Sequence, residues 1–459
     1  MSATAVQPKY PRTLFERVAD ARRRSDAIFD LLAPEALYDR PIPERHRLIF
    51  YLGHLEAFDW NLLGRGALDL KTENAEFDKL FAFGIDPTNG HLPNDVPGDW
   101  PSESQVRAYN AHTRDLLDEN IARAMHVRPE IPGLADGTLL NVAIEHRLMH
   151  AETLAYLVHQ LPFEKKLKDR ATPSIGATNE VAPVQHMVTI REGHATLGLP
   201  RHHDDADFSQ AGLRETEYPF GWDNEFEAIK FRVPAFSIDA FPVTNGRFLK
   251  FVRAGGYDDR RLWRPEDWEW KSSAGITHPF FWFPRGDSWN FRGMFEETPL
   301  PLASPVWVSH AEASAYARWR GKSLPTEAQW HRAAYAALDG HERDFPWGSE
   351  LPDRDRGNFD FASWDPAPVG SHPLGASDFR VHDLLGNGWE WTSTPFGPLP
   401  GFEPFPFYRG YSADFFDGKH FVMKGGSQRT AACMLRRSFR NWFQPHYPYV
   451  YAKFRCVEA

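Results

Sequence analysis

The chain has 459 residues, of which 42% are hydrophobic and 25% are charged, and its net charge is −10. This length exceeds what one hydrophobic core usually organises, so we expect two domains, with three as the alternative. An acidic chain without a Lys/Arg run lacks the electrostatic footprint of proteins that bind nucleic acids or anionic membranes.

The cysteine count limits the kinds of metal site. Cys433 and Cys456 are the two cysteines of the chain, which excludes a disulfide scaffold and a thiolate-rich zinc or iron–sulfur site. Histidine, with 20 residues, and carboxylates must therefore hold any metal. No apolar run reaches the length of a membrane span, and the N-terminus lacks a signal-peptide core, so we expect a cytoplasmic protein.

Residues 10–163 are predicted to be helical. Apolar residues recur at helical spacing in four stretches, 12–32, 45–64, 102–125 and 136–161. Ser102 is the expected N-cap of the third stretch and Asp136 that of the fourth. Four helices of this length indicate an up-down bundle, a scaffold that builds metal sites between facing helices.

The pattern changes after the helices. Residues 166–185 mix charge with Pro, Gly, Ser and Thr and show no periodicity, which predicts a linker. From residue 186, short strands, turn residues and many tryptophans favour an irregular α+β domain whose loops carry function. One clear helix is expected at 309–322, with Ser309 as its cap and Glu312 in the capping-box position.

Three histidines are candidate metal ligands. His146 and His150 are four residues apart on the fourth helix, about 40° apart around its axis, on an apolar stripe. His54 lies on another predicted helix, and three neutral imidazoles would leave open positions on iron, copper, nickel or zinc. From spacing alone, this metal site and three unrelated packed histidines are equally good interpretations.

The first half of the chain resembles the DinB-like bundle of the iron-dependent sulfoxide synthases of ergothioneine and ovothiol biosynthesis. The family's HxxxHxE iron motif is matched by His146, His150 and Glu152, and its upstream ligand by His54 in IFYLGHLEAF. The resemblance implies an all-α DinB-like four-helix bundle over residues 1–165, a linker over 166–185 and a second domain over 186–459.

The second half resembles the formylglycine-generating-enzyme fold, an irregular α+β, C-type-lectin-like domain. The motifs that carry this resemblance are PVTNGRFLKFV (242–252), GKSLPTEAQWHRAA (321–334), FPWG (345–348), LLGNGWEWTSTPF (384–396), KGGS (424–427) and KFRC (453–456). We expect GNGWEW and GKSLPTEAQW to hold the fold rather than to do chemistry.

The resemblance implies a non-haem Fe(II) enzyme that uses O2 to join the sulfur of a small thiol to the imidazole of hercynine or histidine. The family's catalytic tyrosine, a proton or hydrogen-bond donor, is matched by Tyr408 in FPFYRGYS, with Tyr411 as the alternative. Asn441 and Trp442 match positions that contact the amino-acid part of the imidazole substrate. An amide can hydrogen-bond a carboxylate, and Trp can attract a trimethylammonium group by cation–π interaction.

Several positions depart from the best-known members. Relatives that use γ-glutamylcysteine carry an acidic residue and an arginine where this chain has Phe443 and Tyr447. Their absence favours free cysteine or another small thiol. Met149 replaces a substrate-contacting Gln, and Gln428 and Arg429 replace the usual pair after GGS. Arg429 is a candidate contact for a substrate carboxylate, with a surface position as the alternative.

Within this family, the motifs of the chain resemble those of the ovothiol-type enzyme, the 5-histidylcysteine sulfoxide synthase, more than those of the ergothioneine-type enzymes. The segments that resemble it are KLFAFGIDP (79–87), IEHRLMHAETL (144–154), and residues 399–420 and 439–455. Ovothiol-type enzymes usually continue into a methyltransferase domain. We therefore expect either a separate methyltransferase as a pathway partner or a stand-alone branch like the ergothioneine-type enzymes.

Three other functions compete with this interpretation. A true formylglycine-generating enzyme needs a cysteine pair where this chain has Thr430 and Leu435, and Cys433 fits neither place. A non-catalytic ligand-binding module of the same fold would not need three metal ligands and Tyr408. A related iron enzyme could use a different thiol or a selenol donor.

Overall fold

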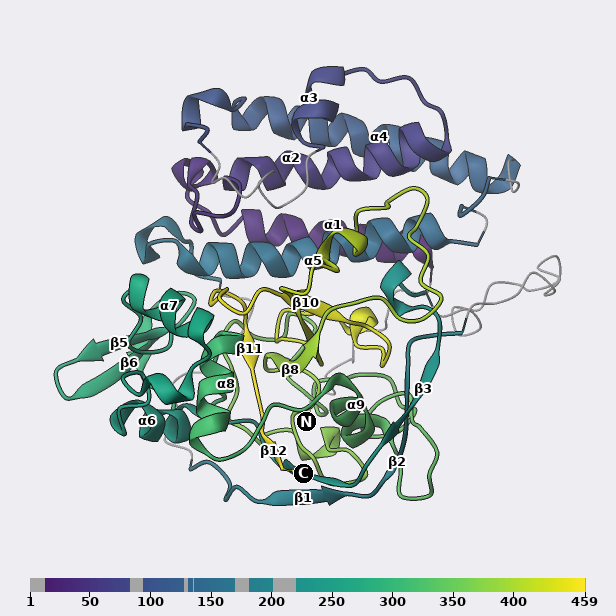
Figure 1. The fold of residues 1–459 in the computed structure, drawn as a ribbon. Helices are drawn as coiled ribbons and strands as arrows, with labels where there is room; N and C mark the ends of the chain where they lie inside the picture. Colours follow the sequence, from purple (N-terminus) through teal and green to yellow (C-terminus); the bar gives the residue numbers. More distant parts are fainter. Residues whose placement is uncertain are drawn as a thin grey trace, which may run out of the picture. The chain divides into compact units, whose positions relative to one another are not determined.

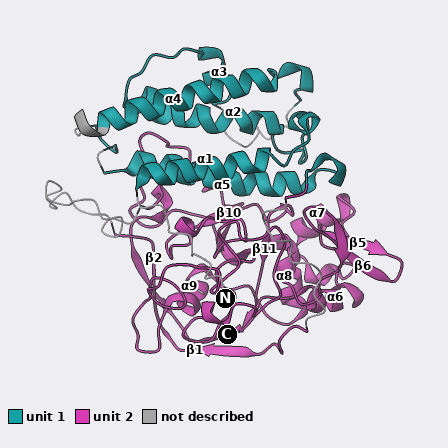
Figure 2. Ribbon diagram, turned by 180° about the vertical axis from the view of Figure 1, so that it is seen from behind, with its two compact units in different colours: residues 1–167, 205–220 teal, residues 168–204, 221–459 magenta. Residues whose placement is uncertain are grey.

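The computed structural model describes residues 13–82, 94–127, 131–134, 136–169, 181–200 and 220–458. Its contacts divide the chain into two compact units (Figure 2): unit 1 comprises residues 1–167 and 205–220, and unit 2 comprises residues 168–204 and 221–459. Residues 83–87 of the KLFAFGIDP segment and residues 170–180 of the expected linker lie outside the described ranges.

The regular structure of the described part of unit 1 is helical (Figure 1), apart from one isolated β-bridge between Leu32 and Lys166. Its α-helices are α1 (Leu14–Phe29), α2 (Leu48–Asp59), α3 (Ala75–Leu80), α4 (Glu103–Val127) and α5 (Thr138–Gln160). Short 3-10 helices span Pro34–Tyr38, Pro97–Asp99 and Phe163–Lys165. α1 packs along α5 and α2 packs along α4, while α2 also contacts α5. The four long helices expected from the sequence are therefore present.

Local signals set where these helices begin. Ser102 caps α4, since its Oγ accepts a hydrogen bond from the backbone N–H of Gln105 at 3.4 Å, as expected. The prediction for α5 was wrong by one residue, because Gly137 occupies the N-cap in a left-handed conformation at φ 75°. Asp136 still contributes, since its carboxylate accepts from the N–H of Thr138 at 2.9 Å.

α2 is buried on nearly every side, with Phe58 the one residue of the helix that is partly exposed. Burial on all sides places α2 in the core of unit 1, together with its ionisable residues His54, Glu56 and Asp59. Directly after it, Trp60–Ala67 continues as a π-helix, a rare form that is frequent near functional sites.

Unit 2 is built from short strands with long connections (Figure 1). Its three- and four-stranded sheets have the orders β1-β4-β12, β5-β6-β7 and β10-β9-β8-β11, and β2 pairs with β3. The strands are β1 (Met187–Ile190), β2 (Gly193–Leu197), β3 (Ile229–Val233), β4 (Phe236–Asp239), β5 (Trp282–Arg285), β6 (Ser288–Arg292), β7 (Glu297–Pro299), β8 (Trp389–Pro395), β9 (Phe421–Lys424), β10 (Asn441–Phe443), β11 (Ala452–Lys453) and β12 (Val457–Glu458). β11 runs parallel to β8, and the other pairs are antiparallel.

Three of the sequence motifs meet at one buried carboxylate in unit 2. Glu390 of GNGWEW is fully buried and accepts hydrogen bonds from Trp330 Nε1 at 2.8 Å and from Arg455 Nε at 2.7 Å. Trp330 belongs to GKSLPTEAQW and Arg455 to KFRC, and Lys453 Nζ lies 3.4 Å from the same carboxylate. These contacts support the interpretation that the motifs hold the fold.

Unit 2 contains more helix than the sequence indicated. The expected helix is α8 (His310–Trp319), with Ser309 and Glu312 in a capping box. The structure adds α6 (Asn245–Arg253), α7 (Pro265–Ser273) and α9 (Glu327–Tyr335). Each of the three has nine residues, one fewer than α8, and Thr244 and Thr326 are the N-caps of α6 and α9. The expectation of a single clear helix was therefore wrong. None of the described helices combines the length and hydropathy needed to cross a lipid bilayer.

Candidate metal centre

His54, His146 and His150 come together in the core of unit 1. His54 lies on α2, and His146 and His150 lie one turn apart on α5. All three are buried, and each offers one ring nitrogen such that the three atoms lie within 4.8 Å of one another. Among the described residues, no other group of three or more His, Cys, Asp or Glu side chains is this close. Glu152 of the HxxxHxE motif is also buried on α5, outside this group.

Aromatic side chains surround the imidazoles. The ring of Phe58 stacks on His146 with 3.4 Å between centroids, and Phe50 stacks on His54 at 4.9 Å. Tyr51 lies 5.9 Å from His150 by the same measure. All three rings come from α2. Phe50 and Tyr51 are buried, Phe58 is partly exposed, and together they shield the histidines from water.

The hydrogen bonds around the imidazoles leave nitrogen lone pairs for a ligand. The carbonyl oxygen of Phe81 lies 2.7 Å from His54 Nδ1. Because a carbonyl only accepts, Nδ1 carries the proton and donates, and the lone pair is on Nε2. His150 Nδ1 is buried and has no hydrogen-bond partner within the described part of the chain.

Burial keeps all three histidines neutral. It lowers the pKa of His54 to about 4, and it holds the pKa values of His146 and His150 well below the usual range, with neighbouring positive charge adding to the effect. A metal ligand must be a neutral imidazole, so this environment suits ligation near pH 7. Three neutral nitrogen donors without thiolate fit iron, copper, nickel or zinc, and three ligands leave positions open for small molecules.

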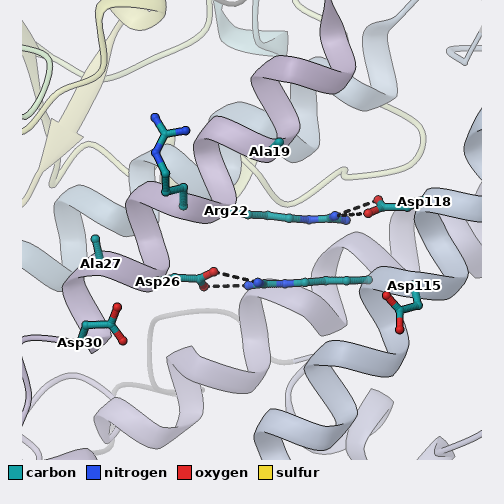
Figure 3. A pocket seen from close by; sticks show the side chains of 9 residues that line it. Ala19, Arg22, Asp26, Ala27, Asp30, Asp115 and Asp118 are labelled. Carbon is teal, nitrogen blue, oxygen red and sulfur yellow. Dashed lines mark hydrogen bonds and ion pairs between the residues drawn. The ribbon is translucent and has the colours of Figure 1, made fainter.

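The described part of unit 1 also has an open surface groove between α1 and α4, separate from the histidines. It is lined by Ala19, Arg22, Arg23, Asp26, Ala27, Asp30, Arg114, Asp115 and Asp118. Two ion pairs cross it, Arg22 with Asp118 and Arg114 with Asp26. Figure 3 labels Arg22, Asp118 and Asp26 and marks both pairs with dashed lines. No predicted site residue lines this groove.

Tyr408 lies in unit 2, in the loop between β8 and β9. Its ring packs near Trp222 and Tyr411, with centroid distances of 6.5 and 5.6 Å. Burial, followed by the negative charge of Asp223, raises the pKa of Tyr408 to about 12. The phenol is therefore protonated at pH 7 and can donate a hydrogen bond.

Asn441, Trp442 and Phe443 form β10, which pairs with β9. Trp442 stacks on Phe396 at 4.1 Å, and its own backbone N–H donates to Asn441 Oδ1 at 2.8 Å. Phe443 stacks on Tyr447 at 5.3 Å. The positions that hold charged residues in relatives using γ-glutamylcysteine thus form an aromatic pair in this chain.

Arg429 is buried rather than on the surface, with 4% of its area exposed. Its guanidinium lies 3.6 Å from the centroid of the Trp364 ring and donates to the carbonyls of Phe361 and Ser363 at 3.3 and 3.4 Å. Neighbouring Gln428 is fully buried and donates to the Trp364 carbonyl at 3.2 Å. Both side chains therefore contribute to the packing of this loop.

The cysteines occupy contrasting positions. Cys433 is exposed, and Cys456 is buried, where burial raises its pKa well above the usual range. Thr430 and Leu435, at the places where a formylglycine-generating enzyme has its cysteine pair, are both buried. A two-cysteine active site is therefore absent from this part of the described structure.

The sequence interpretation missed two sets of buried charges. Asp223 is fully buried next to Trp222, and its Oδ1 accepts from the hydroxyl of Ser412 at 2.5 Å. Glu56 and Arg147 form an ion pair in the core of unit 1. A charged residue inside an apolar helix is the signal that could have revealed the second set, because buried charges require partners.

Comparison with known proteins gives consistent similarities. Residues 173–459 match the family model described as a sulfatase-modifying factor enzyme 1-like domain. The chain is 37% identical over 348 residues to the hercynine oxygenase of Mycolicibacterium smegmatis, covering 74% of this chain and 75% of that protein. It is 32% identical over 466 residues to the hercynine oxygenase of Mycolicibacterium thermoresistibile, covering 99% and 96%. It is 29% identical over 453 residues to ergothioneine biosynthesis protein 1 of Schizosaccharomyces pombe, where it spans 54% of the longer relative.

Proposed function

Because the chain belongs to the ergothioneine-type sulfoxide synthases, the family of the hercynine oxygenases, we propose that it is an iron-dependent enzyme joining the sulfur of a small thiol to the imidazole of hercynine. Membership of this family makes the chain an oxygenase of ergothioneine biosynthesis. Histidine is the alternative acceptor, and the ovothiol-type motifs of the sequence keep that alternative open.

The observation that carries the proposal is the group of three buried, neutral imidazoles in unit 1. His54, His146 and His150 would hold Fe(II), which, when bound, supplies the activation of O2 and the redox capacity of the reaction. The stacked rings of Phe58 and Phe50 restrict the rotation of the imidazoles and keep water away from them. Phe81 fixes the tautomer of His54 through its carbonyl.

The overall reaction balances with O2 as the oxidant. The thiol loses its S–H hydrogen and the imidazole loses one C–H hydrogen as the C–S bond forms, which releases two electrons. Oxidation of the sulfur to the sulfoxide releases two more. These four electrons reduce O2 to one sulfoxide oxygen and one water molecule, so no further reductant is needed.

Tyr408 is the proposed proton donor of the reaction. With a pKa of about 12, its phenol stays protonated over the physiological pH range, so it can donate a hydrogen bond or a proton without prior titration. Its ring is held by Trp222 and Tyr411. Tyr411 is the alternative donor, and its close stacking on Trp222 at 3.9 Å favours a packing role.

The proposed substrate contacts lie on and after β10. Asn441 would bind the carboxylate of the imidazole substrate through its amide, and Trp442 offers an aromatic face to the trimethylammonium group of hercynine. Phe443 and Tyr447 provide no charge for a second carboxylate or ammonium group, which supports cysteine as the thiol. Arg429 stays a predicted carboxylate contact, although its present partners give it a packing role.

The test is anaerobic loading with Fe(II), followed by O2, cysteine and either hercynine or histidine, with products identified by mass spectrometry. The expected product has the mass of the two substrates plus one oxygen and minus two hydrogens, and the preferred acceptor identifies the branch of the pathway. Cysteine sulfinate as the sole product would retain the iron site but remove the imidazole acceptor. If no iron bound, the non-catalytic binding module would replace the enzyme.

A further inference from the structure

A cluster of buried charges lies directly beside the histidines in unit 1. Arg147 of α5 is 2% exposed, and its guanidinium donates to both carboxylate oxygens of Glu56 on α2, at 2.9 and 2.8 Å. The same guanidinium donates to Asp59 Oδ2, also on α2, at 2.7 Å. The two helices that carry the metal-binding histidines are therefore joined by a two-pronged ion pair.

One hydrogen bond connects the neighbours of two histidines. Arg147 directly follows His146, and Leu55 directly follows His54. Arg147 Nη2 donates to the backbone carbonyl of Leu55 at 3.0 Å. This hydrogen bond therefore joins α2 to α5 at positions that directly follow His54 on one helix and His146 on the other.

Glu56 extends the connection to the other two long helices. It is 1% exposed and also accepts from Arg114 of α4, at 2.9 Å from Nε and 2.6 Å from Nη2. Arg114 in turn forms a two-pronged pair with Asp26 of α1, at 2.8 and 2.7 Å. One carboxylate therefore fixes α2 against α5 and, through Arg114, against α4 and α1.

Stability alone is a weak reason for such a cluster. Well-packed apolar residues in place of a buried ion pair are often as stabilising, because desolvation of the charges offsets their attraction. Apolar contacts are non-directional, whereas a guanidinium–carboxylate fork has a fixed geometry. Metal ligation requires ligand distances held within about 0.2 Å. A directional ion pair beside the histidines can hold the two helices at the spacing that these distances need.

We propose that Arg147 is a positioning residue for the metal centre, setting the spacing of α5 against α2 so that His146 and His150 meet His54 at ligation distance. This inference rests on the proposed iron site. Loss of the fork would leave the bundle folded around its apolar residues but would let the two helices shift relative to each other. Metal affinity would therefore suffer more than folding.

The test compares two identical substitutions in the same bundle. Arg147→Lys keeps the positive charge but cannot form the fork. Arg22→Lys is the control, because Arg22 Nη1 donates to both carboxylate oxygens of Asp118 at 2.8 Å and so joins α1 to α4 instead of α2 to α5. Each full-length protein is titrated with Co(II), with ligand-field absorption as the readout, and the metal-free proteins are compared by thermal unfolding. We expect Arg147→Lys to raise the Co(II) dissociation constant about 10–100-fold, the usual effect of disturbing the support of a metal ligand, and to change the absorption envelope, while Arg22→Lys retains both.

Each outcome decides between a positioning and a purely structural role. If Arg147→Lys lowers the unfolding temperature but binds Co(II) like the wild type, with the same spectrum, the inference is overturned. If Arg147→Lys does not fold, Glu56→Gln, which keeps the volume and one acceptor oxygen, is titrated instead, and wild-type affinity there would also overturn it. Failure of the wild type itself to bind Co(II) would instead contradict the proposed function.

Discussion

Acidification is expected to destabilise the metal-free protein through its buried histidines. Burial lowers the pKa of His54 to about 4, whereas an imidazole in an unfolded chain has a pKa of about 6.5. Below pH 6.5 the unfolded chain binds a proton that the folded chain does not accept. The free energy of unfolding therefore falls as the pH decreases from 6.5 to 4 and levels off below that value.

The size of the effect follows from the two pKa values. For His54 alone, the difference in proton binding amounts to about 2 kcal/mol between pH 7 and pH 5. His146 and His150, whose pKa values burial also lowers, act in the same direction. Since a typical domain has a free energy of unfolding of about 5–15 kcal/mol, the three together make metal-free unit 1 markedly sensitive to acid.

The assay is native-state hydrogen exchange of peptides from α2 and α5, with a chelator present, at pH 5, 6 and 7 after correction for intrinsic exchange. His54→Gln removes one titrating group, so its stability should fall by about 2 kcal/mol less than that of the wild type between pH 7 and pH 5. Identical pH dependence in the wild type and His54→Gln would refute the reasoning.

Four other predictions concern the metal, the chemistry, the thiol and the fold. Fe(II) or Co(II) at 100 times its dissociation constant should stabilise unit 1 by about 2.7 kcal/mol and raise its unfolding temperature by about 5–11 °C. An unfolding temperature that calorimetry finds unchanged by the metal would contradict ligation. Tyr408→Phe should lower the rate of sulfoxide formation about 10²–10⁴-fold and retain metal binding, whereas Tyr411→Phe should have a smaller effect. A wild-type rate of sulfoxide formation in Tyr408→Phe, measured by mass spectrometry, would exclude Tyr408 as the proton donor. Phe443→Asp combined with Tyr447→Arg should increase use of γ-glutamylcysteine relative to cysteine in a competition assay, and an unchanged ratio would remove the argument for a small thiol. Glu390→Gln should destabilise unit 2 by about 3–5 kcal/mol, because Arg455 and Lys453 lose their buried counter-charge; an unchanged tryptophan-fluorescence midpoint in urea would contradict this role.

The sequence by itself determined the broad architecture and the candidate metal ligands. Apolar stretches of helical length predicted α1, α2, α4 and α5. The second stretch was expected to be an amphipathic helix, whereas α2 is buried on nearly every side. Four-residue spacing placed His146 and His150 on one face of α5, which is a local property of any helix. The motifs around Glu390 identified the fold of unit 2 because they supply the charges and tryptophans of its core.

Only the tertiary structure decided which distant residues meet. His54 joins the other two histidines because α2 packs against α5, and no local period encodes that contact. The same holds for the burial of Arg429 on the ring of Trp364. Arg147 shows the difference most clearly: its sequence neighbours place it on a helix, but its bonds to Glu56, Asp59 and the Leu55 carbonyl exist only in the assembled bundle, because a buried charge gains its partners through packing.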